Sequence, residues 1–444
     1  MMFSNKDLKK LLIPLIIEQM LTSLIGTVDT MMVSNLGSAP VSGVALVDSI
    51  NKLVIFLFTA LATGGTIVCS QYIGRRDIKN ANTAGRQVLL SAFTLALVAA
   101  AIAYIFRLGI LRLIFGTVEK DVFDCAAAYF RITILSYPFI ALFGAASAIY
   151  RAGGKTRLPM KVSLVANLIN IVGNATFMFV LDMGVVGAAT ATLISNAFAA
   201  ITMLIMLRRP GQSLDIGPYA AIRPNFHMIW LVLCIGIPSG IENAMFQFGK
   251  LAVQSTVSTL GTTAMAANAV VAAIELMTSM PSQAVATGLM TVVGQCMGAG
   301  KPDQAKYYIK KLTLWSFAIL FVLNWLAMAL TPLITRLSGM DAETTKMTMD
   351  TMLFISILKP VFWMCAFVPA SGMRAAGDVK FGMIVSTCTM WILRVGLSTL
   401  LCRHFGMGLI GIWWGFFADW TGRSIIFLLR YRSGKWAKQK VIDT

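Results

Sequence analysis

Long apolar segments are the feature that most constrains how this chain can fold. A hydrocarbon core about 30 Å thick takes roughly 20 apolar residues per helical crossing. Lipid offers no hydrogen bonds to the backbone, so uniformly apolar runs of this length form helices and not strand pairs. The first run is also too long for the apolar core of a signal peptide, and we expect it to be retained. Twelve helices are predicted, at residues 9–35, 44–73, 84–109, 121–150, 158–181, 184–207, 227–258, 264–296, 308–335, 346–373, 380–403 and 408–430.

Composition agrees with a protein that lies almost wholly in the membrane. Of the 444 residues, 57% are hydrophobic and only 13% are charged, whereas soluble domains carry about 25% charged residues. Twelve crossings with short loops use the whole length, so no separate soluble domain is expected. The seven cysteines form no CxxC pair and there are only two histidines. We therefore expect no metal or redox cofactor and no enzyme activity.

The positions of the basic residues predict how the chain is inserted. The net charge of +18 would suggest nucleic acid in a soluble protein. Here, however, 25 of the 37 Lys and Arg residues fall in the amino terminus, the even-numbered loops and the tail, and only six in the opposite loops. Cytoplasmic loops carry this excess. We expect a multi-pass plasma (inner) membrane protein with both termini cytoplasmic and no nucleic-acid partner.

An internal repeat organises the chain. At one constant offset, Pro14 aligns with Pro238 and Glu18 with Glu242, and several glycines follow the same spacing. Each half holds six helices, an even number, so both halves enter the membrane in the same orientation. Their pseudo-two-fold axis should run along the membrane normal. The predicted division is an N-lobe at 1–208, a cytoplasmic linker at 209–226, a C-lobe at 227–432 and a cytoplasmic tail at 433–444.

Six acidic residues inside the predicted helices are the strongest candidates for function. A charged side chain at the bilayer centre costs about 2.5–3.5 kcal/mol on insertion scales, so such residues usually face a cavity or an ion route. They are Glu18, Asp29, Asp48, Glu242, Glu275 and Asp419.

Local sequence offers a structural explanation for four of these acids. Asp48 precedes Lys52, and Asp419 precedes Arg423, by one helical turn, which is the spacing of a local ion pair. Glu18 and Glu242 each follow a helix-bending proline by one turn and could satisfy the freed backbone.

The other two acids have no such explanation. Glu275 has no opposite charge within a turn, and Asp29 stands alone in the middle of the first helix. An acid of this kind can be protonated, cation-bound or empty, which favours a role in ion coupling.

Several short motifs resemble the multidrug and toxic compound extrusion (MATE) transporters. The resemblance covers essentially the whole chain, and the order and spacing of the motifs are specific. The matching segments are Pro14…Val28-Asp29-Thr30…Leu36-Gly37, Arg151-Ala152-Gly153-Gly154 and Val293-Gly294-Gln295…Gly298-Ala299-Gly300.

The resemblance implies two lobes around a central cleft that export mainly cationic, amphipathic compounds in exchange for Na⁺ or H⁺. It places the coupling cation, Na⁺ or H⁺, at Asp29, with polar groups from Asn170 and Thr192. Asn174 stands where some branches have a second Asp. This change keeps a carbonyl ligand but removes one charge, and it leaves Asp29 as the only carboxylate of the predicted site.

A second set of polar residues is assigned to the substrate cleft. Another branch of the family carries a Glu eight residues after the proline of the seventh helix, where this chain has Phe246 and where Glu242 lies one turn earlier. Acids in the cleft would attract cationic substrates electrostatically. The residues assigned to this surface are Asp48, Glu242, Asn243, Asn268 and Glu275.

Two functions of different class follow. The first is a cation-coupled exporter, acting as a monomer on small organic cations within membrane lipids. The alternative is a flippase for a lipid-linked precursor, which usually needs extra helices and a strongly cationic cleft. A non-transporting scaffold would not need isolated intramembrane acids. The cations within the predicted helices are Lys52, Arg131, Lys250, Lys359, Arg394 and Arg423.

Overall fold

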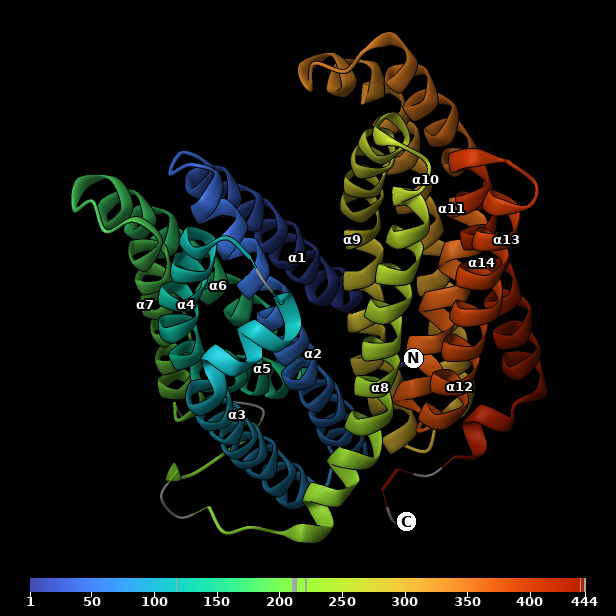
Figure 1. Ribbon diagram of the computed structural model, residues 1–444. Helices are drawn as coiled ribbons and strands as arrows, with labels where there is room; N and C mark the ends of the chain where they lie inside the picture. Colours follow the sequence, from blue (N-terminus) through green and yellow to red (C-terminus); the bar gives the residue numbers. More distant parts are fainter. Residues whose placement is uncertain (117, 210–213, 220–221, 440, 443–444) are drawn as a thin grey trace. The chain divides into compact units, whose positions relative to one another are not determined.

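A computed structural model describes residues 1–116, 118–209, 214–219, 222–439 and 441–442. Every regular element among these residues is a helix (Figure 1). The packing divides the chain into two compact units. One is Asp7–Gly240, and the other joins Met1–Lys6 to Ile241–Thr444, so that the division falls within a helix, α8 (Phe226–Ser258).

The first unit contains the first six predicted helices. The second and third helices extend past both ends of their predicted apolar runs, because polar residues continue the helix, and the sixth has its predicted bounds. The fourth helix is interrupted by a short 3₁₀ turn ahead of Pro138, and the fifth ends in a π-helical segment. The elements are α1 (Asn5–Ser34), α2 (Ser38–Arg75), α3 (Ile78–Phe115), α4 (Lys120–Thr133), η1 (Ile134–Ser136), α5 (Tyr137–Ala152), α6 (Arg157–Asn174), η2 (Ala175–Val180) and α7 (Gly184–Leu207).

The second unit repeats this pattern, and the six predicted helices of this half are confirmed as well. The eleventh predicted helix contains a π-helical segment, as the fifth does. The elements after α8 are α9 (Thr262–Gly298), α10 (Pro302–Leu337), α11 (Ala342–Ala375), α12 (Val379–Thr389), η4 (Met390–Leu397), α13 (Ser398–Arg403), α14 (Gly408–Ser433) and η5 (Lys435–Lys438).

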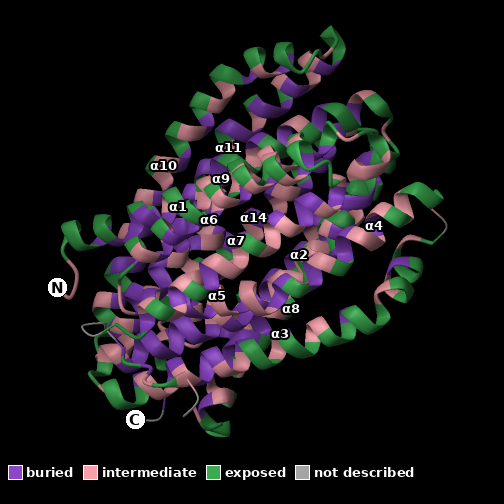
Figure 2. Cartoon of the chain, turned by 90° about the vertical axis from the view of Figure 1, so that its left-hand side faces the viewer, coloured by how far each residue is buried: buried purple, intermediate pink, exposed green. Residues whose placement is uncertain are grey.

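Eleven helical spans of the described chain are long and apolar enough to cross a membrane, and α14 is the one predicted span outside this set. Their surfaces agree with a lipid environment. Figure 2 shows exposed residues along much of α3, where Ile105 is 70% and Leu113 is 87% exposed. Large apolar side chains exposed along a whole helix are covered by acyl chains in a membrane protein. The interior of the second unit is rich in aromatic residues, with Trp363, Trp413 and Trp420 in one cluster.

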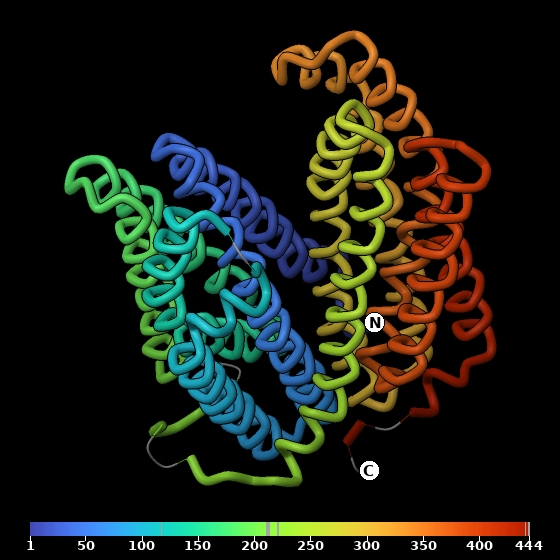
Figure 3. Tube along the Cα trace, in the orientation of Figure 1, coloured from blue at the N-terminus to red at the C-terminus, as the bar shows by residue number. Residues whose placement is uncertain are grey.

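Two segments outside the membrane spans are fixed by side-chain hydrogen bonds. The Asp77 carboxylate caps α3 by accepting from the Asn80 backbone N–H at 3.1 Å, and bonds from the Asn80 backbone and amide hold the pKa of Asp77 below its usual value. Figure 3 follows the connection from α7 to α8. Its described part is held to α3, because Arg86 Nε donates to the Ile216 carbonyl at 2.7 Å and Gln87 Nε2 to the Arg223 carbonyl at 2.9 Å.

Candidate functional site

One ion pair recurs at equivalent positions in the two units. In the first unit Arg151 Nη2 lies 2.8 Å from Glu18 Oε1, and in the second Arg374 Nη2 lies 2.5 Å from Glu242 Oε2. Each pair joins the first helix of its half to the last turn of the fourth membrane crossing. Glu18 and Glu242 are therefore neutralised by a guanidinium from another helix.

Asp29, Asn170, Asn174 and Thr192 come together in the first unit. Asn174 Nδ2 donates to Asp29 Oδ1 at 2.7 Å, and the Asn170 amide lies 3.3 Å from Thr192 Oγ1. The other end of the Asn170 amide faces the Asp29 carboxylate, 2.8 and 3.1 Å from its two oxygens. Helices α1, α6 and α7 each contribute to this group.

The side-chain oxygens of this group are of the kinds that bind a small cation. Sodium-like hard cations take carboxylate, amide and hydroxyl oxygens. Asn174 Oδ1 is buried, and no described residue donates a hydrogen bond to it, which is a costly state for a buried acceptor. The Asn170 amide can turn either its nitrogen or its oxygen to the carboxylate, so it can solvate Asp29 alone or a cation bound to Asp29. Among the residues that the structure describes, no Lys or Arg lies within ion-pair distance of Asp29.

Asp48 on α2 belongs to the surroundings of Asp29. The two carboxylates are close enough to interact electrostatically, and Lys52 contributes an opposing charge at Asp48. Tyr129 OH donates to Asp48 Oδ1 over 3.5 Å. Tyr129 was missed by the sequence interpretation, because it lies on α4 and no local pattern connects it to α2.

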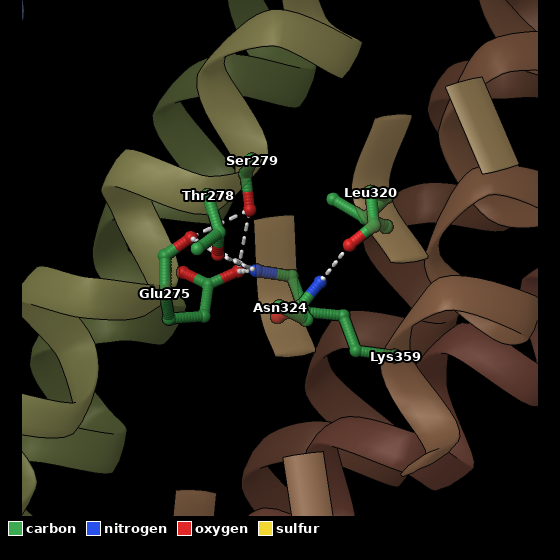
Figure 4. Close-up of polar contacts among 6 residues, drawn as sticks. All are labelled: Glu275, Thr278, Ser279, Leu320, Asn324 and Lys359. Carbon is green, nitrogen blue, oxygen red and sulfur yellow. Dashed lines mark hydrogen bonds and ion pairs between the residues drawn. The ribbon is translucent and has the colours of Figure 1, made fainter. Parts of the chain in front are cut away.

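Glu275 is ion-paired in the second unit (Figure 4). Lys359 on α11 is fully buried, and its Nζ lies 3.1 Å from Glu275 Oε1. The same ammonium donates at 2.9 Å to the Glu275 carbonyl and to Thr278 Oγ1, and Ser279 Oγ donates to Glu275 Oε1 at 2.9 Å. The sequence analysis found no opposite charge within one turn of Glu275. Its partner could not be found in this way, because Lys359 comes from another helix, α11.

Asp419 on α14 is shared by two arginines. The predicted pair with Arg423 is confirmed at 2.7 Å, and Arg394 from η4 lies 2.6 Å from the other carboxylate oxygen. Arg423 also donates to the Ser386 carbonyl at 2.9 Å. Both arginine side chains and the aspartate are almost fully buried.

A cavity of about 210 Å³ lies within the second unit, between α8, α9, α11, α12, η4 and α14. Three of the residues assigned to the substrate cleft line it, namely Glu242, Asn243 and Glu275. Asn268 is buried on α9 and is not part of this wall, and Asp48 lies in the first unit. The assigned residues therefore come from both units, and within the second unit not all of them line this cavity.

Together these observations define a multi-pass helical membrane protein built from a duplicated six-helix half, with charged side chains gathered inside each half. The sequence model of the MatE family matches residues 14–176 and again residues 238–400. The chain therefore belongs to the MatE family of membrane transporters. The starts and the ends of the two matched segments are separated by the same offset that relates Pro14 to Pro238, in agreement with the predicted repeat.

Transporters from several bacteria are similar over nearly the whole length. The chain is 27% identical to an "Uncharacterized transporter YisQ" of Bacillus subtilis, over 96% of this chain and 94% of that protein. It is 26% identical to a "Probable multidrug resistance protein NorM" of Thermotoga maritima, over 99% and 94%. The solved outward-facing structure of a multidrug resistance MATE family transporter superposes with a TM-score of 0.91 over 96% of this chain and 95% of that one, at 20% identity.

Proposed function

We propose that the protein is an antiporter that exports amphipathic, mainly cationic compounds in exchange for Na⁺ or H⁺, with Asp29 as the coupling carboxylate. The observation that carries this proposal is the contrast between Asp29 and four of the other five intramembrane acids. Glu18, Glu242, Glu275 and Asp419 each have a Lys or Arg within 3.1 Å, whereas Asp29 has amide donors and no such cation among the described residues. Because no Lys or Arg of the described chain pairs with Asp29, its carboxylate is available to bind Na⁺ or H⁺.

The chemistry of the site supports a direct link between ion binding and conformational change. Protonation or Na⁺ binding changes the charge at Asp29 by about one unit. Helix α1 contains Pro14 and Gly26, at which a helix can alter its bend. A cation that binds one conformation more tightly than another shifts the population toward it, and this difference in binding free energy is the source of coupling. The multidrug names of relatives such as NorM of Thermotoga maritima favour export of drugs over the flipping of a lipid-linked precursor.

The basic residues support a plasma-membrane topology with both termini in the cytoplasm. We infer that the protein acts there as a monomer, without a bound cofactor. Fusing alkaline phosphatase or green fluorescent protein to the carboxyl terminus tests the sidedness. We expect a fluorescent, phosphatase-inactive terminus, and an active phosphatase would contradict this topology.

The coupling role is tested by Asp29→Asn, which removes a charge without changing the size of the side chain. Efflux of a fluorescent cationic dye from proteoliposomes should be lost under both an imposed Na⁺ gradient and an imposed H⁺ gradient. Comparing the two gradients in the wild type identifies the coupling ion. Thermal stability in detergent should remain, because Asn replaces a partly buried acid.

Asp182→Asn is the matched control, since Asp182 is an exposed acid of the same unit. It should transport as the wild type does. Wild-type efflux from Asp29→Asn would assign the coupling site to another acid.

A further inference from the structure

The cavity of the second unit is lined by more basic than acidic groups. Its wall and the residues paired with that wall carry five bases and only three acids among the described residues. Asp419 serves two arginines at once. The side chains around the cavity therefore carry more positive than negative charge, which is costly inside a membrane protein. The bases are Lys250, Lys359, Arg374, Arg394 and Arg423, and the acids are Glu242, Glu275 and Asp419.

Arg394 is the group that most needs a further partner. Its side chain is only 2% exposed, yet its Nε has no hydrogen-bond acceptor among the described residues. The guanidinium lies over three rings that also line the cavity, at 4.3 Å from the centroid of Phe416, 5.1 Å from Phe246 and 5.8 Å from Trp420. Rings hold a guanidinium in place, but they do not accept its N–H bonds as an oxygen does.

The repeat relates two positions of this cavity wall to two positions of the Asp29 site. Arg394 follows Asn170, and Phe416 follows Thr192, at the offset that relates Pro238 to Pro14. The same pair of positions is in contact in both units. In the first unit the amide at this position faces a carboxylate, whereas in the second unit the position holds a guanidinium, and Val253 replaces Asp29. The element that offers oxygens to a cation in one half therefore offers N–H donors in the other.

We propose that this cavity binds the carboxylate of a small aromatic organic acid. Arg394 supplies the planar donor fork that fits a carboxylate, Lys250 adds a second positive charge, and Phe246 and Trp420 supply faces for a flat ring. The 210 Å³ volume is below the roughly 300–1,000 Å³ of pockets for whole drug-sized ligands, so it suits a small acid or the acidic end of a larger compound. The inference rests on the proposed function only for the claim that the bound compound is exported.

The test is equilibrium binding to the full-length protein in detergent, with no ion gradient, so that it does not depend on coupling. Isothermal titration calorimetry compares benzoate with benzamide, its neutral isostere, and with benzylammonium, its cationic counterpart. We expect benzoate to bind at least about tenfold more tightly than either, the discrimination of one charge-assisted hydrogen bond. Equal affinities for the three compounds, or no binding of benzoate, would overturn the proposal.

Variants then locate the bound acid. Arg394→Met leaves Asp419 paired with Arg423 and should weaken benzoate binding about tenfold, with little change for benzamide. Lys250→Gln alters an exposed side chain, is expected to fold, and should weaken benzoate binding in the same sense. Arg403→Met, an exposed arginine of the same unit outside the cavity, should bind as the wild type does. Benzoate affinity unchanged in both Arg394→Met and Lys250→Gln would show that the acid binds elsewhere.

Discussion

At the scale of single residues, the intramembrane acids differ in whether their charge is balanced by the fold. Glu275 is matched by Lys359, which directs its donors to the Glu275 carboxylate, the Glu275 carbonyl and Thr278. Such a pair joins α9 to α11. In the part of the chain that the structure describes, Asp29 is contacted by the neutral amides of Asn170 and Asn174, and the proposed function requires its charge to change.

Breaking the Glu275–Lys359 pair from one side should destabilise the protein strongly. Lys359→Met leaves a carboxylate without its buried partner, which costs about 3–5 kcal/mol. The double variant Glu275→Gln with Lys359→Met removes both charges and should recover most of this loss. Detergent thermal unfolding of the two single variants and the double variant measures the difference. A double variant as unstable as Lys359→Met would show that the charges are not the source of the loss.

Restoring a second carboxylate beside Asp29 should strengthen cation binding. Asn174 already lies 2.7 Å from Asp29, and Asn174→Asp adds one negative charge to the ligand set. We expect the half-maximal Na⁺ or H⁺ concentration for dye efflux to fall by about tenfold, or about 1.4 kcal/mol. Asn167→Asp, one turn from Asn170 on the same helix, serves as the control. An unchanged ion dependence in Asn174→Asp would argue against Asn174 as part of the site.

The sequence was informative about which charged residues lie inside the helices and much less so about their partners. Asp29 could be singled out because a charge in an apolar run is expensive wherever it faces, and this cost is visible in the chain itself. Lys359, Tyr129 and Arg394 became partners only through tertiary packing. Their positions along the chain hold no periodicity that connects them to the acids they meet.

At the scale of helices, two π-helical segments lie at the internal sites. η2 follows Asn174 directly, and η4 contains Arg394. A π segment widens the helix locally and re-aims the side chains around it, and such segments are frequent at functional sites. The twelve spans were predictable, because the length of an apolar run is a strong signal. The π segments could not be predicted from the sequence. Their residues are as apolar as those of an ordinary helix, and their hydrogen bonding depends on packing against neighbouring helices.

Helix α2 depends on a glycine for its close approach to α8. A Cβ at Gly64 would lie 2.4 Å from the Val232 carbonyl oxygen, and backbone atoms cannot yield as a side chain does. Gly64→Ala should therefore cost about 1–3 kcal/mol through overpacking. Gly144→Ala is the control, because no atom lies within 4 Å of its Cβ position, and it should gain about 0.5–1 kcal/mol from the helical preference of Ala. Melting in detergent distinguishes them, and a neutral Gly64→Ala would contradict this packing.

At the scale of the whole molecule, the two halves share the ion pairs that join their helices but differ in the residues of their internal sites. The Glu18–Arg151 and Glu242–Arg374 pairs recur with nearly the same offset, whereas Asn170 and Arg394 have different chemistry at matching positions. Helix packing is thus retained by one set of residues while another set is free to diverge. The repeat itself was visible in the sequence, since its glycines and prolines are shape-determining residues with a fixed spacing.

The two recurring ion pairs should contribute independently to stability. Glu18→Gln and Glu242→Gln each leave an arginine with a neutral acceptor, and each should lower the melting temperature in detergent. The pairs lie in separate packing units, and the effects of sites that share no partners add within about 0.3–0.5 kcal/mol. We expect the double variant to show the sum of the two shifts, and a markedly larger or smaller shift would reveal coupling between the units.

Because the chain is duplicated, each half can serve as an internal control for the other. A substitution at any site residue can be repeated at the equivalent position of the other half, in the same preparation and the same lipid. Differences between the two results then report the chemistry of the side chains and not the batch, the detergent or the expression level. Exchanging Asn170 and Arg394 between the halves would ask whether selectivity for the sign of a ligand's charge is a portable property of one helix or belongs to the half that surrounds it.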